Sequence, residues 1–121
     1  MLNEKAMKGL VNASPEKRYK SFLNTVTDLE EVWFLSAEDG YATFSVDEFV
    51  HVLVWPRKEF CRILISENEQ PTSLDVHEFL KKCETLEDNV RFMVFPTRTD
   101  SYVVTTKKLC SDIREYLDAI E

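Results

Sequence analysis

Two histidines and three cysteines are the residue types in this chain best suited to metal or nucleophilic chemistry: His51, His77, Cys61, Cys83 and Cys110. Zinc sites use these ligands, commonly with two of them close in sequence, as in CxxC or HxxxH. The chain has no such pair, so the sequence predicts neither a metal site nor a bound cofactor. A reactive thiol must be exposed and flanked by positive charge. Cys61 comes closest, beside Arg62, but it falls on the apolar side of a predicted helix.

Acid–base catalysis would need a histidine or carboxylate with a partner that tunes its pKa. His51 lies among apolar residues in a predicted strand, where a neighbouring group could simply satisfy its ring. Alternatively, a carboxylate such as Glu59 or Asp39 could pair with it, which would indicate an enzyme of unknown reaction. The acidic pairs of the chain stand at predicted turns and strand edges, where carboxylates are usually solvated. The sequence therefore identifies no catalytic residue and keeps the enzyme as the alternative hypothesis.

A set of aromatic and arginine side chains is the better candidate for a site. Pro56 ends an apolar run, because proline cannot donate to a strand ladder but suits the first turn of a helix. Such a helix start turns backbone N–H groups outward, and Arg57 adds a donor fork that suits a carboxylate. Aromatic and arginine side chains are typical of the residues that dominate binding energy. The predicted binding residues are Arg18, Tyr19, Trp33, Trp55, Pro56 and Arg57.

The competing interpretation is that Trp33 and Trp55 are core residues. A binding anchor must be at least partly exposed, with one end in an apolar setting and the other in water. The two interpretations therefore differ in one measurable property, the exposure of Trp55.

The first half of the chain predicts two helices followed by three strands. Asn3 and Ser14 are typical of helix caps, and Pro15 suits the first turn of the second helix. The strands are expected at 31–35, 41–46 and 49–55, with a turn that uses Gly40 between the first two. The third strand is apolar on both faces, which predicts a central position in the sheet.

The second half predicts helices around a β-hairpin. We expect a helix over 56–65, a polar loop over 66–72 and a helix capped by Ser73. Strands over 91–95 and 101–105 should pair across a hairpin-length loop, and Thr106 should cap the last helix. The expected fold class is α+β: a mostly antiparallel sheet of about five strands, a three-strand meander plus a hairpin, with helices packed against it. Residues 1–121 should form a single domain.

Composition narrows the classes of partner. The chain has 121 residues, 44% of them hydrophobic, and a net charge of -7. The negative charge disfavours nucleic acid and anionic membrane surfaces, and it would attract a basic partner. The first five residues lack the apolar segment of a signal peptide, and no apolar run approaches a membrane span. We expect a cytoplasmic protein whose three cysteines are buried and reduced.

Several short motifs, in order along nearly the whole chain, resemble the bacterial family called domain of unknown function 2750. The most specific are Val54-Trp55-Pro56-x-x-Glu59-Phe60 and Val94-Phe95-Pro96-Thr97; weaker ones include Ser14-Pro15-x-x-Arg18-Tyr19, Glu31-Val32-Trp33 and Asp39-Gly40-Tyr41. The chain departs from the family pattern at Cys83, where a tryptophan is usual, and in the last hairpin loop, which lacks a glycine. The resemblance implies a bacterial cytosolic α+β domain and no particular activity.

The function that these observations favour is a non-catalytic protein-interaction module. Its partner would be another protein, and an immunity-like protein that blocks a basic toxin is the sharpest version of this hypothesis. The sequence leaves the partner, the oligomeric state and the strand order open. A cavity that combines His51 with a carboxylate would favour the enzyme instead, and an open apolar surface would favour the binding module.

Overall fold

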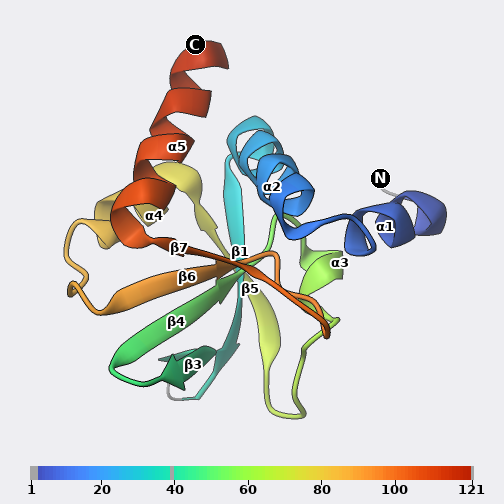
Figure 1. The fold of residues 1–121 in the computed structure, drawn as a ribbon, viewed down its shortest axis with the longest axis horizontal. Coiled ribbons are helices and arrows are strands. Elements are labelled where there is room, and N and C mark those ends of the chain that lie inside the picture. The colour runs from blue at the N-terminus through green and yellow to red at the C-terminus, as the bar shows by residue number, and fades with distance from the viewer. Residues whose placement is uncertain (1–2, 39, 121) are drawn as a thin grey trace.

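The computed structural model describes residues 3–38 and 40–120, which form five helices and seven strands (Figure 1). The helices are α1 (Glu4–Val11), α2 (Pro15–Leu29), α3 (Lys58–Cys61), α4 (Val76–Cys83) and α5 (Thr106–Ile120). The strands are β1 (Glu31–Ala37), β2 (Gly40–Tyr41), β3 (Thr43–Val46), β4 (Phe49–Val54), β5 (Gln70–Asp75), β6 (Val90–Val94) and β7 (Tyr102–Thr105). The α+β class predicted from the sequence is confirmed.

The strands form two sheets, so the prediction of one sheet is wrong. Sheet A has the antiparallel order β2-β1-β5, and sheet B has the mixed order β3-β4-β6-β7. The second predicted strand, over 41–46, breaks at Ala42, so β2 pairs with β1 while β3 pairs with β4. The expected meander is therefore divided between the sheets. Backbone hydrogen bonds between Trp33 of β1 and Trp55, which follows β4, join the two sheets. Figure 1 shows the strands of both sheets converging near the centre of the molecule.

Sheet B contains a parallel pair that the sequence did not predict. β4 and β6 run in the same direction, and the segment 55–89, with α3, β5 and α4, makes the crossover that a parallel pair requires. β6 and β7 form the predicted antiparallel hairpin. β4 lies between β3 and β6, so its predicted central position is confirmed.

Strand β5 falls where the sequence predicted a polar loop. It pairs along its whole length with β1, from Asp75 opposite Glu31 to Gln70 opposite Ser36. Pro71 is tolerated because β5 is an edge strand, where a missing backbone donor breaks no pairing on the outer side. The pairing depends on a partner far away in the chain, so local composition could not indicate it.

The N-terminal cap of helix α4 lies two residues later in the chain than predicted. Asp75, not Ser73, is the cap: its Oδ1 accepts from the backbone N–H of His77 at 2.9 Å and of Glu78 at 3.3 Å. Ser73 lies within β5 opposite Trp33. Likewise, the N–H of Lys108 donates to Oγ1 of Thr105, so Thr105 rather than Thr106 caps α5. The caps predicted at Asn3 and Ser14 are confirmed.

The cap assignment predicts different costs for two alanine variants. Asp75→Ala should lower the free energy of unfolding by about 0.5–2 kcal/mol, because two N–H groups lose their acceptor. Ser73→Ala should change it by less than about 0.5 kcal/mol, since Ser73 is exposed and caps nothing. Urea denaturation of the three proteins measures both. Equal losses in the two variants would contradict the assignment.

The chain leaves β4 at Pro56 as predicted, but the helix there is shorter than expected. α3 spans Lys58–Cys61 rather than 56–65, because Pro56 and Arg57 form a bend before it. Phe60 and Cys61 are buried, as their apolar positions predicted.

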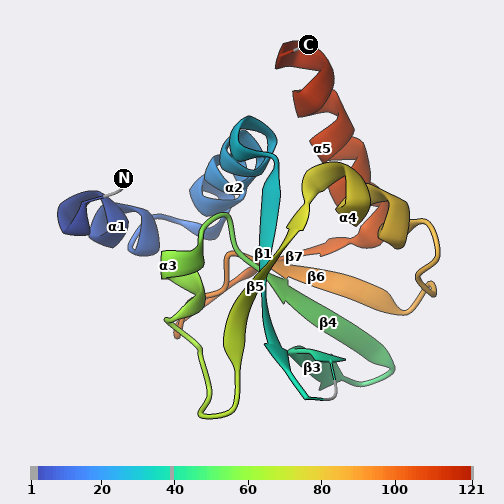
Figure 2. The same cartoon turned by 180° about the vertical axis from the view of Figure 1, so that it is seen from behind.

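The hydrophobic core lies between sheet B and helices α2, α4 and α5. Figure 2 shows the arrangement of these helices and strands from behind. Phe79 of α4 packs edge-on against Phe92 of β6, with 5.4 Å between ring centroids, and also contacts Phe34 of β1. Through Phe79, helix α4 therefore contacts both sheets. Within residues 3–38 and 40–120, no helix combines the length and apolar character needed to cross a membrane.

Candidate functional site

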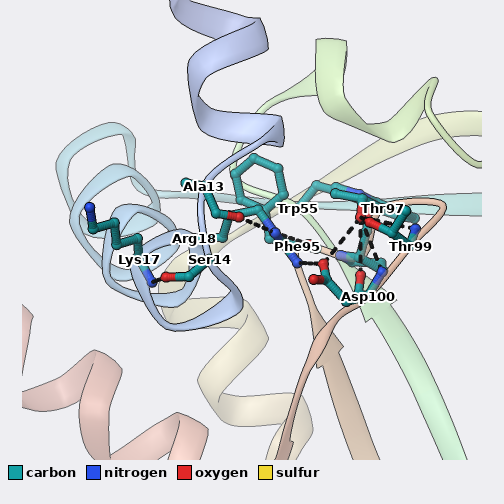
Figure 3. Close-up of polar contacts among 10 residues, drawn as sticks. Ala13, Ser14, Lys17, Arg18, Trp55, Phe95, Thr97, Thr99 and Asp100 are labelled. Carbon is teal, nitrogen blue, oxygen red and sulfur yellow. Dashed lines mark hydrogen bonds and ion pairs between the residues drawn. The ribbon is translucent and has the colours of Figure 1, made fainter.

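Arg18, predicted as a binding residue, is instead fully buried at the centre of a polar clamp (Figure 3). Its Nε donates to the carbonyl of Phe95 at 3.1 Å, Nη1 donates to the carbonyl of Ala13 at 2.6 Å, and Nη2 forms an ion pair with Asp100. The fixed fork of the guanidinium suits three acceptors in different directions. Arg18 thus ties the start of α2 to the loop between β6 and β7.

Trp55 belongs to the same buried region, so the prediction that it is an exposed anchor is wrong. Its side chain is 0% exposed, and Nε1 donates to the carbonyl of Pro96 at 3.0 Å. Pro56 is buried beside it. The tryptophan before Pro56 and the Phe95-Pro96 segment therefore contact each other across 41 residues of sequence. The two most specific motifs of the chain, around Trp55-Pro56 and Phe95-Pro96, therefore contact each other inside the protein and do not form a binding surface.

Phe95 marks where the chain turns out of sheet B. Its φ of +50° lies in the left-handed region, which is unfavourable for a bulky residue. Three contacts hold it there: its N–H donates to Val54, its carbonyl accepts from Arg18, and its ring packs on Phe60 at 4.6 Å. The side chain of Thr97 bonds within the following loop, accepting from the backbone N–H of Asp100. Hydrogen bonds of Thr97 with Thr99 and Asp100 thus tie the loop 96–100 together (Figure 3).

The other predicted binding residues lie in separate places. Tyr19 is buried, stacks on Tyr102 at 4.4 Å and donates to Asp112 at 2.6 Å. Burial, with this hydrogen bond and the nearby carboxylate, raises the pKa of Tyr19 far above its ordinary value. Trp33 is half-buried, with Nε1 at 3.3 Å from a carboxylate oxygen of Glu31. The six residues therefore do not form one exposed surface.

Arg57 is the member of the predicted set that faces an open space. It lines a groove of about 550 Å³ between the C-terminal parts of α2 and α5, together with Asn24, Asp28 and Glu115. Its Nε is buried and has no hydrogen-bond partner among the described residues. Binding of a carboxylate by Arg57 stays a prediction, and the two carboxylates already lining the groove work against it.

The histidine site expected for an enzyme is not assembled among the described residues. His51 is buried, and its Nδ1 lies 3.1 Å from the carbonyl of Phe44 on the neighbouring strand. No hydrogen bond or ion pair joins it to Glu59 in the described part of the chain, and Asp39 lies outside the described residues. His77 of α4 is exposed, with its Nε2 3.4 Å from a carboxylate oxygen of Glu30.

The surface that stands out is one face of sheet B. Directly paired residues of neighbouring strands lie on the same face, and so do alternate residues within a strand. Val54, Phe92, Val94 and Val104 face the helices and are buried. The opposite face, here called the open face, consists of Phe44, Val46, Phe49, His51, Leu53, Arg91, Met93, Val103 and Thr105. Among these nine, only His51 is buried.

The open face is apolar and includes some of the most exposed hydrophobic side chains described. Phe44, Val46 and Val103 are 55%, 42% and 47% exposed. Between Phe44, Leu53 and Met93 on one side and the loop 96–100 on the other, the face is hollowed into a groove of about 430 Å³. Isolated exposed hydrophobic residues are common on proteins, but a contiguous apolar face typically marks an interaction site.

One end of the open face carries a group of acidic side chains. Asp47 and Glu48 form the turn between β3 and β4, while Glu87 and Asp88 precede β6, and all four are exposed. The two segments lie side by side, because Asn89 donates through its side chain to the carbonyl of Glu48 and accepts from the N–H of Val50. Arg91, the nearby basic residue, stacks over the Phe49 ring at 4.3 Å and donates to the carbonyl of Asp88.

The sequence already contained the signal for part of this surface. Phe44 and Val46 alternate with polar residues along a strand, a pattern that predicts one buried face. The same pattern arises when the apolar face is left open, so alternation alone cannot separate core from surface. The missed residues, such as Met93 and Val103, join the surface only through strand pairing.

Comparison with known proteins identifies the family of the chain. Among curated proteins, no match is found. The family match covers residues 19–113, which include Trp55, Pro56, the Phe95-Pro96 segment and every strand of both sheets. Since this is most of the chain, the protein belongs to the family DUF2750, described as a protein of unknown function.

Proposed function

We propose that this protein is a non-catalytic interaction module that binds a basic protein partner on the open face of sheet B. The observation that carries the proposal is the contiguous apolar face formed by Phe44, Val46, Leu53, Met93 and Val103. Covering apolar side chains of this kind provides most of the driving force for protein association. The site thus differs from the surface near Trp55 that the sequence favoured.

Charge selects the class of partner. The acidic group at Asp47, Glu48, Glu87 and Asp88 borders the apolar face, and the whole chain carries a net charge of -7. A partner with apolar side chains and lysines or arginines around them would match both features and would associate faster at low salt. A second copy of the chain would instead bring like charges together. An immunity-like protein that blocks a basic toxin in the cytosol is one member of this functional class.

The edge of β3 adds a way of holding such a partner. β3 is the outer strand of sheet B, and its four residues are all exposed. An extended segment could therefore add its backbone to β3 while alternate side chains contact Phe44 and Val46.

A synthetic probe of defined chemistry tests the proposal. A short peptide of alternating leucine and lysine should bind and shift the NMR signals of Val46, Leu53, Met93 and Val103, because it combines an apolar strand with positive charge. The matching peptide of leucine and glutamate should not bind. Binding should weaken as salt rises, because the Debye length falls from about 10 Å at 0.1 M to about 3 Å at 1 M.

Matched variants locate the binding site. Phe44→Ser should weaken peptide binding about tenfold, or about 1.4 kcal/mol, because it removes a central apolar contact. Leu29→Ser is the control, since Leu29 is also exposed but ends α2, one of the helices that cover the other face of sheet B. Equal binding of the two peptides, or shifts centred on Leu29 or Ile120, would contradict the proposal. Dimerisation of the wild type through the open face would assign it to a second copy instead.

A further inference from the structure

A pair of thiols lies on the side of sheet B opposite the open face. Cys83 is the last residue of α4, Cys110 is in the second turn of α5, and both line one cavity of about 300 Å³. Each is buried, at 6% exposed, but unlike a residue enclosed in the core each lines this cavity. The cavity reaches the end of sheet B, and its charged lining is mixed: Lys107 and Arg114 of α5 and Arg91 of β6, with the carboxylates of Glu84, Glu87 and Asp88. The two cysteines are 27 residues apart in sequence, and the packing of α4 on α5 brings them together.

The two thiols influence each other and differ in acidity. A hydrogen bond from Cys83 lowers the pKa of Cys110 below its ordinary value, while burial works against this; Arg114 adds to the lowering and Glu84 opposes it. The same hydrogen bond, together with burial, raises the pKa of Cys83. Cys110 is therefore the sulfur that ionises first, and Cys83 keeps the proton.

Cys61 provides a contrast within the same chain. It is 0% exposed, and its sulfur lies 3.8 Å from the carbonyl of Phe34 and 3.9 Å from that of Arg57. Burial raises its pKa to about 12. It does not line the cavity that Cys83 and Cys110 share.

We propose that Cys83 and Cys110 form a reversible dithiol–disulfide site whose oxidant is hydrogen peroxide. The Cys110 thiolate attacks one peroxide oxygen: an S–O bond forms, the O–O bond breaks, and the released hydroxide takes a proton to become water. Sulfur is oxidised to a sulfenic acid and the peroxide is reduced. The Cys83 sulfur then attacks the Cys110 sulfur, so that an S–S bond forms, the S–O bond breaks and the Cys83 proton leaves in the second water.

The arrangement favours a disulfide over a metal site. Structural zinc requires four ligands, and catalytic zinc three. Among the described residues, no group of three or more histidine, cysteine, aspartate or glutamate side chains is placed to hold a metal ion. A nucleophilic thiol with a second thiol against it is the arrangement found in redox-sensing cysteine pairs.

Oxidation followed by mass spectrometry tests the proposal. Hydrogen peroxide added to the reduced native protein should remove two hydrogen atoms from its mass, and peptide mapping should place the link between Cys83 and Cys110. A dithiol reductant should restore the original mass. Dimedone, which traps sulfenic acids, should label Cys110 of the wild type during the reaction. This last measurement needs no variant and so does not depend on a variant folding.

Serine variants separate the three cysteines. Cys83→Ser should stop at the sulfenic acid, so dimedone labelling of Cys110 should rise. Cys110→Ser should lose both the disulfide and the label, and Cys61→Ser should react as the wild type does. Labelling or oxidation of Cys61 before Cys110, or disulfides between two protein molecules in place of the internal one, would overturn the proposal. So would an unoxidised pair under conditions that oxidise glutathione completely.

Discussion

Replacing Trp55 with alanine is expected to lower the free energy of unfolding by about 3–5 kcal/mol. The side chain is completely buried between the two sheets and the Phe95-Pro96 segment, so truncation leaves a large cavity. It also leaves the carbonyl of Pro96 without the Nε1–H donor that now satisfies it. Urea or thermal denaturation measures the loss, because a chain of this length usually unfolds as one cooperative unit.

Two further variants separate packing from hydrogen bonding at this position. Trp55→Phe keeps most of the buried ring and removes the donor, so it should cost only about 1–3 kcal/mol. Trp33→Ala should cost less than Trp55→Ala, because Trp33 is half-buried. A loss below about 1 kcal/mol for Trp55→Ala would show that the residue is not part of the core.

Replacing Arg18 with methionine is expected to cost about 2–4 kcal/mol of stability. Methionine fills a similar volume but donates no hydrogen bond, so the carbonyls of Ala13 and Phe95 lose their partners. Asp100 is 44% exposed and can turn to water, which keeps the cost below that of breaking a fully buried ion pair. Chemical denaturation measures the effect. Because the guanidinium also holds the loop 96–100, amide hydrogen exchange in that loop should accelerate in the variant.

Lys17 offers a matched control on the same helix. Lys17→Met makes the same change of charge at an exposed neighbouring position and should alter stability by less than about 0.5 kcal/mol. Arg18→Lys should recover little of the lost stability, since one ammonium group cannot reach three acceptors that the planar fork serves. Similar losses in Lys17→Met and Arg18→Met would show that net charge, rather than the clamp, accounts for the effect.

Features that depend on a few neighbouring residues could be predicted from the sequence. The caps at Asn3 and Ser14 follow from side chains that reach N–H groups three residues ahead. The apolar stripes of α2 and α4 follow from helical spacing, and their residues Phe22 and Phe79 are buried. Gly40, predicted at a turn that needs positive φ, has a φ of +121°. Burial of the three cysteines was also predicted correctly.

Features that depend on distant partners could not be predicted in this way. β5 is a strand because β1 offers it six partners, although its own residues include Pro71 and several polar side chains. The parallel pairing of β4 with β6 joins segments separated by a crossover of 35 residues, 55–89. The division into two sheets at Ala42 likewise arises from competition between β1 and β4 for one segment.

The candidate sites follow the same division. The sequence by itself determined the residue types: an acidic chain, a central strand that is apolar on both faces, three thiols and an arginine beside a tryptophan–proline pair. Only the tertiary structure decided which apolar face the helices cover, since alternation along a strand looks the same whether a face is buried or open. It also buried Trp55 and Arg18 together, and it brought Cys83 against Cys110. Side-chain chemistry is local, whereas exposure and proximity depend on which distant segments pack together.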